Sequence, residues 1–571
     1  MVVLGISAYY HDSAAALIVD GNVTAAICEE RLSRIKHDRS FPKRAIAFCV
    51  EYSGIKYTDI DYVVFYEKPF RKFERILTTH IFHAPKGFKT FVKAMPIWLK
   101  ERLDMKSTIM KSLNGLCQQR INWDIRFVEH HLSHAAMAYF TSPFESAAIL
   151  VVDAVGENAT TSLFEAIGSK IECIKQQSFP NSVGLFYSAF TYFLGFQVNS
   201  DEYKVMGLAP YGDLCAEQTQ RFINIIKTKL ISIEDDGSIT INQKYFTFMV
   251  GLRMVDDHVW TKLFGIAKRE ANTPIKEEHK NLAAAIQNVT EEIFFKLVTH
   301  ISSLTQCKNL CISGGCALNC AAIGKVKASG LFSDVFVPFA PGDDGGAIGV
   351  ALAFYALASG KKCMSNVSPY QGCSFENEDV EKAIKDKELE FCFVQEENLY
   401  DQIAASLSTG NIVGWFQERM EFGPRALGNR SILADPRNPS MKERVNAKVK
   451  YRESFRPFAP VVTQEDASRF FEDSSSPFMM STTKVRHGMT LIPAVTHVDN
   501  TARIQTVSEA SNLRLYRLLK AFEKYSGVPI LLNTSFNVMG EPIVCTPQDA
   551  IKTFKASGID ILVINNYIIK K

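Results

Sequence analysis

The chain has 571 residues, 47% of them hydrophobic and 22% charged, a composition typical of a globular protein with more than one hydrophobic core. The formal net charge of +3 argues against an extensive nucleic-acid-binding surface, and no apolar run reaches the length of about 18 residues that a membrane-spanning helix requires. Thirteen cysteines scattered along a large chain, together with an N-terminus that lacks a basic leader, predict a cytoplasmic protein with reduced thiols.

The first predicted element is a strand at Val2–Ile6, followed by a polar turn, a second strand at Ala14–Val19 and a third at Val23–Cys28. An Asp-Gly hairpin turn joins the last two strands. The same succession of strand, polar turn, strand and hairpin returns at residues 147–177. This repetition predicts a duplicated α/β domain. It resembles the actin/hexokinase-like (ribonuclease H-like) architecture, in which the turns after the two first strands address the phosphates of a nucleotide.

The later elements continue in an α/β pattern. Residues 62–120 predict a basic, helix-rich insert, and a long amphipathic helix at 282–306 leads into a strand at Asn309–Ile312. Beyond a linker at 358–372 we expect a second α/β domain at 373–571, following a first domain at 1–357 with halves 1–146 and 147–357. Its expected elements are a helix at Leu399–Ser408, strands at Ile412–Phe416 and Val528–Leu532, helices at Leu513–Tyr525 and from Pro547, and a final strand at Asp560–Ile564.

The segment EFGPRALGNRSILADPR, residues 421–437, places Arg425, Arg430 and Arg437 among glycines and prolines after a predicted strand. Guanidinium groups bind phosphate and carboxylate bidentately, and glycine lets the backbone approach a ligand closely. The segment therefore predicts an anion site, with a solvated arginine-rich turn as the alternative. Arg456 and Arg503 add cationic candidates downstream.

A metal site is the prediction for the segment FVEHHLSHAAMAYF. His130 and His134 are four residues apart, which places both imidazoles on one face of a helix. Asp153, at a strand end, and Asp343 or Asp344, in PFAPGDDGGAIG, are candidate carboxylate ligands. Such a donor set favours iron, manganese or zinc over calcium. The alternative is a pair of ordinary core or surface histidines.

Two glycine turns, in LCISGGCALN and PFAPGDDGGAIG, each separate a strand from a helix, where backbone amides can meet a phosphate. A third turn, in SDEYKVMGLAPYGD, adds Lys204 and Gly207. In the first polar turn, His11 beside Asp12 is a candidate general base for a hydroxyl group, and Lys36 follows in EERLSRIKHD. The alternative for this pair is an aspartate that caps a turn next to an exposed histidine.

These motifs coincide over nearly the whole chain. The chain resembles the O-carbamoyltransferases of the nodulation, cephamycin and tobramycin type. The motifs that carry this resemblance are YYHDSAAALI, EERLSRIKHD, HHLSHA, EYKVMGLAPYG, SGGCALN, GDDGGAIG, MEFGPRALGNRSILADPR and LLNTSFNVMGEPIV. The resemblance implies an N-terminal domain related to tRNA threonylcarbamoyl transferases and a C-terminal YrdC-like domain. It implies that the C-terminal domain makes carbamoyladenylate from carbamoyl phosphate and Mg-ATP, and that the N-terminal domain passes the carbamoyl group to a small-molecule hydroxyl and releases AMP.

The resemblance also implies roles for individual residues. The metal ligands would be His130, His134, Asp153 and Asp343, with Fe(II) as the ion. The residues beside the transferring group would be His11, Asp12 and Lys36, and those of the nucleotide pocket Lys204, Gly207, Gly314, Gly315 and Asn319. The activation site would comprise Arg425, Arg430, Lys450, Arg456, Arg503, Asn533 and Ser535.

The expected partners are the hydroxyl acceptor and a second copy of the chain in a homodimer, without nucleic acid or membrane. Two alternative functions share much of this pattern. An actin-like small-molecule kinase would need the same phosphate turns, and a tRNA-modifying enzyme of the threonylcarbamoyl type would need a related transfer domain. The near-neutral charge disfavours the second. A non-catalytic binding module would not require all the proposed ligands.

Overall fold

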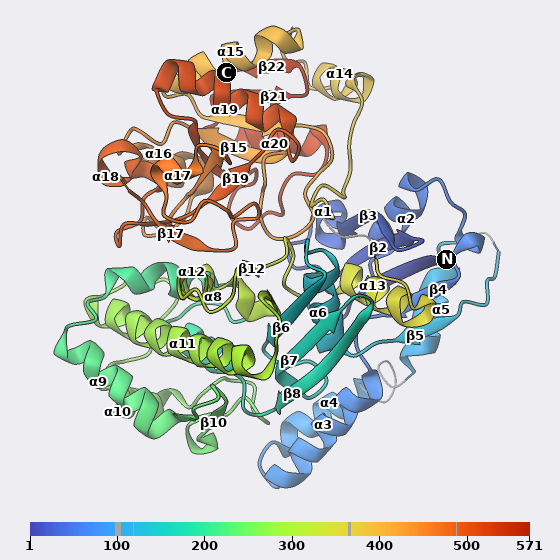
Figure 1. Ribbon diagram of the computed structural model, residues 1–571, viewed down its shortest axis with the longest axis vertical. Coiled ribbons are helices and arrows are strands. Elements are labelled where there is room, and N and C mark those ends of the chain that lie inside the picture. Colours follow the sequence, from blue (N-terminus) through green and yellow to red (C-terminus); the bar gives the residue numbers. More distant parts are fainter. Residues whose placement is uncertain (98–103, 118, 364–366, 487) are drawn as a thin grey trace. The chain divides into compact units, whose positions relative to one another are not determined.

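The computed structural model describes residues 1–97, 104–117, 119–363, 367–486 and 488–571. The predicted insert at 62–120 and linker at 358–372 therefore each include positions outside the described residues. The structure is α/β throughout (Figure 1). It divides into two compact units: the first comprises residues 1–8, 14–24 and 41–367, and the second comprises 9–13, 25–40 and 368–571. Segments 9–13 and 25–40, which the sequence-based division assigned to the first domain, thus group by their contacts with the C-terminal residues.

Two five-stranded sheets contain the duplicated pattern. The first sheet consists of β1 (Val2–Ser7), β2 (Ala14–Val19), β3 (Asn22–Cys28), β4 (Tyr62–Phe65) and β5 (Ile125–Phe127). The second consists of β6 (Ser146–Val152), β7 (Ala159–Ile167), β8 (Lys170–Ser178), β11 (Asn309–Ser313) and β12 (Asp334–Phe336). Their orders, β3-β2-β1-β4-β5 and β8-β7-β6-β11-β12, match strand for strand. In each, the first strand pairs antiparallel with its hairpin partner and parallel with a later strand. The predicted duplication of the actin/hexokinase-like type is confirmed.

Helices α6 (His130–Phe140) and α13 (Gly346–Ser359) of the first unit pack against each other. Gly349 allows this close approach, because a Cβ at this position would lie 2.0 Å from the backbone oxygen of Ser133. The helix predicted at 282–306 is α11 (Glu277–Leu304). The other helices of eight or more residues in this unit are α2 (Lys43–Tyr52), α3 (Pro69–His83), α4 (Phe88–Ile97), α5 (Met105–Asn114), α7 (Val183–Phe193), α9 (Glu217–Ile225), α10 (Asp257–Phe264) and α12 (Cys320–Ala328).

The second unit is built on an eight-stranded mixed sheet with the order β13-β22-β21-β14-β15-β20-β16-β19. Its strands are β13 (Cys392–Phe393), β14 (Val413–Phe416), β15 (Arg430–Ala434), β16 (Ala459–Thr463), β19 (Gln505–Val507), β20 (Ile530–Ser535), β21 (Ile561–Ile564) and β22 (Tyr567–Lys570). The main helices are α14 (Asn377–Lys385), α15 (Glu396–Ser408), α19 (Leu513–Ser526) and α20 (Pro547–Ala556). The predicted final strand at Asp560–Ile564 is therefore not the last, because a turn at Asn565 and Asn566 leads into β22.

Both faces of this sheet are covered by helices. Along β20, Ile530 and Leu532 belong to one buried apolar cluster, and Leu531 between them belongs to the other. Side chains from helices α14 and α20 contribute to the first cluster, and side chains from helices α15 and α19 contribute to the second. Since successive side chains of a strand point to opposite faces, one continuous apolar run can supply both layers. This is why β20 and β21 contain runs of consecutive apolar residues.

Candidate functional site

Four potential metal ligands converge in the interior of the first unit. His130 and His134 lie one turn apart at the start of α6, Asp153 directly follows β6, and Asp343 lies in the turn before α13. All four side chains are buried. One ligand atom from each lies within 4.8 Å of every other. The neighbouring Asp344 instead accepts a hydrogen bond from the backbone N–H of Gly345 at 2.9 Å, so Asp343 is the aspartate that belongs to this group.

The contacts of this quartet are short. The Nε2 atom of His130 is 3.2 Å from Asp153 Oδ2 and 3.1 Å from the Nε2 atom of His134. Asp343 Oδ1 is 3.5 and 3.6 Å from the same two nitrogens. Two imidazole nitrogens and two carboxylate oxygens directed at one buried point match the donor set of a divalent transition metal. With neutral imidazoles the quartet carries two negative charges, which a divalent ion would balance. The residues present therefore fit such an ion.

Electrostatics within the quartet also favour a cation. Burial lowers the pKa of His130, but the charges of Asp343 and Asp153 outweigh it and raise that pKa to about 9. For Asp153, burial raises the pKa, but the hydrogen bond with His130 and the nearby His134 hold it well below its usual range. Both directions follow from the two carboxylates, whose negative charge favours a positive charge beside them.

The glycine turn after β11 supports one of these ligands. The backbone N–H of Gly315 donates to Asp153 Oδ1 at 3.0 Å. Gly314 has a φ of +89°, and a Cβ there would lie 2.3 Å from the backbone oxygen of Val152, so a side chain is excluded. Gly315, predicted for the nucleotide pocket, thus contacts Asp153 of the quartet, and Gly314 packs against Val152, the residue before Asp153. In the sequence, the two glycines between a predicted strand and a predicted helix indicated this turn.

The remaining nucleotide-pocket candidates lie on α8 (Glu202–Leu208) and α12, which both pack against α11. The Lys204 ammonium pairs with Asp201 at 3.1 Å, and Gly207 is buried within α8. The Asn319 side chain caps α12 by accepting from the N–H of Ala322, and its amide is paired with that of Gln287. Asn319 therefore has a structural role in helix capping beside any contact with a nucleotide.

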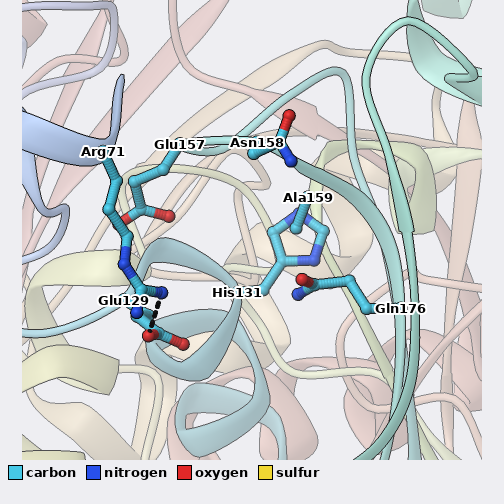
Figure 2. A pocket seen from close by; sticks show the side chains of 7 residues that line it. All are labelled: Arg71, Glu129, His131, Glu157, Asn158, Ala159 and Gln176. Atoms are coloured by element: carbon cyan, nitrogen blue, oxygen red, sulfur yellow. Dashed lines mark hydrogen bonds and ion pairs between the residues drawn. The ribbon is translucent and has the colours of Figure 1, made fainter. Parts of the chain in front are cut away.

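His131, the histidine of α6 that is not part of the quartet, lines a polar pocket (Figure 2). The Nδ1 atom of His131 forms a hydrogen bond with Ser162 Oγ at 2.7 Å. Burial and the neighbouring His130 lower the pKa of His131 to about 3. Glu157, across the pocket, accepts the backbone N–H groups of His130 and Lys68. The other lining residues are Arg71, Glu129, Asn158, Ala159 and Gln176. Sequence reasoning missed Glu157, which anchors the start of α6, because no motif marks it.

In the second unit, two arginines of segment 25–40 form hydrogen bonds with backbone oxygens of the C-terminal residues. Arg31 Nη2 donates to the backbone oxygen of Gly423 at 2.9 Å. Arg34 donates to the backbone oxygens of Ile543 at 2.7 Å and Pro542 at 3.0 Å. His11, Asp12 and Lys36, the predicted transfer residues, belong to the same compact unit as the predicted activation residues.

Positive charge gathers around Lys450 in this unit. Its Nζ atom donates to Ser535 Oγ at 3.1 Å and to Asn537 Oδ1 at 2.6 Å, and to the backbone oxygens of both residues. Burial lowers the pKa of Lys450, and the positive charges of Arg452, Arg456 and Lys36 lower it further. The structure thus brings together Lys36, Lys450, Arg456 and Ser535. An anion bound beside them would relieve the repulsion among these cations.

The arginines of segment 421–437 have different roles. Arg430 is fully buried, and its guanidinium donates to the backbone oxygens of Gln417, Glu418, Asn429 and Cys373 at 2.5–3.2 Å. Burial lowers the pKa of Arg430 to about 10. These contacts make Arg430 a structural residue, not a ligand for a soluble anion. Arg437 forms a two-pronged ion pair with Asp435. Arg425 is half-buried and remains the candidate of this segment for anion binding.

We expect Arg430→Lys to destabilise the protein by about 3 kcal/mol, because a compact ammonium cannot reach the buried carbonyl groups on both sides that the planar guanidinium spans. For a unit of this size, that corresponds to a fall in melting temperature of about 6–12 °C. Scanning calorimetry of the full chain would measure it. Arg437→Lys, which alters a half-buried pair, is the matched control and should shift the melting temperature by a small fraction of that amount. Equal shifts for the two variants would contradict the structural role.

Asn533 lies near this segment, since its Nδ2 atom is 3.4 Å from the backbone oxygen of Ala426. Asn533 Nδ2 donates to Gln505 Oε1 at 2.7 Å, and Gln505 in turn donates to the backbone oxygen of Leu427. Among the described residues, the buried Oδ1 atom of Asn533 has no hydrogen-bond partner. A buried polar atom of this kind is a candidate ligand contact. Arg503 ends strand β18 (Thr501–Arg503).

Comparisons with known proteins agree with this arrangement. Residues 2–352 match the family model described as carbamoyltransferase N-terminus, and residues 404–571 match carbamoyltransferase C-terminus. The chain is 44% identical to an uncharacterized protein of Synechocystis sp. over 100% of its own length and 96% of that protein. It is 38% identical to nodulation protein NolNO of Sinorhizobium fredii over 99% of its length and 79% of that protein.

A third relative is the 3'-hydroxymethylcephem-O-carbamoyltransferase of Amycolatopsis lactamdurans, which is 35% identical over 52% of the chain and 55% of that protein. In the described part of the chain, none of the helices combines the length and the apolarity needed to cross a membrane. Two matching family models that together cover most of the sequence, and relatives of nearly full length, establish the assignment. The chain belongs to the carbamoyltransferase family and is a transferase enzyme.

Proposed function

We propose that the protein is an ATP-dependent O-carbamoyltransferase that first makes carbamoyladenylate and then carbamoylates a hydroxyl group of a small molecule. The main support is the gathering of Lys36, Lys450 and Arg456 in the second unit, because carbamoyl phosphate and ATP are both anions. A relative named for transfer to a hydroxymethylcephem supports an alcohol as the acceptor. A cytoplasmic location and a homodimer stay predictions.

In the first reaction, water releases phosphate from carbamoyl phosphate, and the carbamate oxygen then attacks the α-phosphorus of ATP. A new P–O bond forms, the bond to the β-phosphate breaks, and pyrophosphate leaves. Arg456 would hold the phosphate oxygens, with Arg425 and Arg503 as further cationic candidates. Lys450, whose ammonium donates to Ser535 and Asn537, would add positive charge beside them. Magnesium would accompany ATP.

In the second reaction, the acceptor hydroxyl oxygen attacks the carbonyl carbon of carbamoyladenylate. The bond from that carbon to the phosphate oxygen breaks, AMP leaves, and the hydroxyl proton passes to His11 as the general base. We propose that His130, His134, Asp153 and Asp343 hold a divalent ion, with Fe(II) as our choice. When bound, the ion supplies positive charge that stabilises negative charge on phosphate oxygens.

The products of the reaction test this proposal. The full chain, reconstituted with Fe(II) under anaerobic conditions, is incubated with carbamoyl phosphate, Mg-ATP and a panel of alcohols. We expect AMP and pyrophosphate, and an alcohol whose mass increases by one carbamoyl group. Formation of ADP with a phosphorylated alcohol would instead support the actin-like kinase. Carbamoylation of tRNA in place of the alcohols would support the nucleic-acid-modifying alternative.

A further inference from the structure

Asp12 lies between two histidines, of which only His11 is marked by a motif. His11 Nδ1 is 2.9 Å from Asp12 Oδ2, and His37 Nδ1 is 2.7 Å from Asp12 Oδ1. All three residues belong to the second unit. Because an ionised carboxylate only accepts hydrogen bonds, each imidazole must carry a proton on Nδ1. In a neutral imidazole this leaves the lone pair on Nε2, the atom that a general base uses.

The position of His37 is set by contacts outside this pair. Its backbone N–H donates to Glu30 Oε2 at 2.8 Å, and the other oxygen of Glu30 pairs with Arg31. Asp12 and His37 have φ angles of +52° and +55°, a region that residues other than glycine rarely adopt unless their surroundings hold them there. The backbone is thus held in an unfavourable conformation that directs both side chains toward each other.

Asp12, Glu30 and His37 have ligand atoms within 4.8 Å of one another, a spacing that a cation site would also need. Each carboxylate oxygen of this group, however, already has a partner: the two histidines for Asp12, and Arg31 and the N–H of His37 for Glu30. A hydrogen-bond network accounts for the arrangement without an ion.

Charge reinforces the network. The hydrogen bond to Asp12 raises the pKa of His37 above its usual value, against the effects of burial and of Lys36, and Glu30 adds to the increase. Burial acts to raise the pKa of Asp12, but the hydrogen bonds from His11 and His37 hold it far below its usual range. Asp12 therefore stays ionised and is shared by two donors throughout the neutral pH range.

We propose that His37 is a positioning residue for carbamoyl transfer: through Asp12 it fixes the orientation of His11 and limits how strongly the carboxylate attracts a proton to that ring. This inference rests on the proposed function for the role of His11 as the base. His37 itself does not touch the substrate. It acts by occupying the second oxygen of Asp12, so that Nδ1 of His11 stays the donor to this carboxylate and Nε2 is the nitrogen that takes the hydroxyl proton.

The test is the reaction of His11 with diethyl pyrocarbonate, which acylates neutral imidazole, followed over pH by mass spectrometry of the full chain after trypsin digestion. Cleavage at Arg31 and Lys36 separates His11 from His37. In His37→Ala, Asp12 has one donor fewer, and we expect the pH midpoint of His11 acylation to rise by about 0.5–1 unit. In Asp12→Asn the midpoint should fall. His37→Asn, whose side-chain N–H can replace Nδ1–H, should stay near the parent protein.

An unchanged midpoint in His37→Ala, with a melting temperature like that of the parent, would overturn the proposal. So would a profile that shifts on addition of EDTA in His130→Ala, a variant that we expect to lack the ion of the quartet, since an ion would then occupy the Asp12 site. The assay requires no acceptor, ATP or carbamoyl phosphate. Its result is therefore independent of whether the protein makes carbamoyladenylate, which is judged from AMP and pyrophosphate.

Discussion

His130→Ala is expected to lower carbamoyl transfer to an alcohol by about 10³-fold, since a metal ion contributes several kcal/mol to charge stabilisation. Pyrophosphate release from carbamoyl phosphate and ATP should continue near the rate of the parent protein. The reason is that His130 contacts Asp153, His134 and Asp343 in the first unit, whereas the phosphate-binding cations belong to the second. Metal content by mass spectrometry, carbamoylated alcohol and pyrophosphate are the three measurements.

The neighbouring histidine provides the control for this variant. His131 is equally buried on the same helix, but its Nδ1 atom binds Ser162 and it is not one of the four converging ligands. His131→Gln should keep the bound metal and most of the transfer activity. If His130→Ala abolished pyrophosphate release as completely as Arg456→Ala, the assignment of the quartet to the transfer reaction alone would be wrong.

Arg456→Ala is expected to lower pyrophosphate release by about 10²-fold, because a charge-assisted hydrogen bond to a phosphate contributes roughly 1.5–3 kcal/mol and the remaining cations bind the anion less well. Arg456 contributes to the positive field around Lys450, and it is partly buried. Pyrophosphate release and the binding of ATP, measured by calorimetry, give the effect. Carbamoyl transfer from separately supplied carbamoyladenylate should be affected less.

Arg437→Ala is the matched control for that experiment. Arg437 is in the same unit and is also partly buried, but its guanidinium is committed to Asp435. Its loss should leave pyrophosphate release within about threefold of the parent protein, the effect of less than 1 kcal/mol. Comparable losses in both variants would show that Arg456 acts only through the stability of the unit.

Features with a local cause were predictable from the sequence. The spacing of His130 and His134 follows from the pitch of a helix, and Asp153 was identifiable as the end of a strand. The repeated hairpins predicted the two matching sheets, because alternation and turn residues act over neighbouring positions. The second strand of the C-terminal hairpin was also marked locally, by Asn565 and Asn566 between apolar runs, and this signal was overlooked.

Features that depend on long-range contacts were decided only by the tertiary structure. No local pattern distinguishes Arg430, which is enclosed by backbone oxygens, from Arg425 in the same segment. Nor does one mark His37, which lies outside regular secondary structure, as the second partner of Asp12. The sequence by itself determined the duplicated fold, the family and the residue types of both sites. The tertiary structure decided which side chains meet and that residues 9–13 and 25–40 belong to the C-terminal unit. Both depend on packing between segments hundreds of residues apart, and no spacing along the chain encodes such packing.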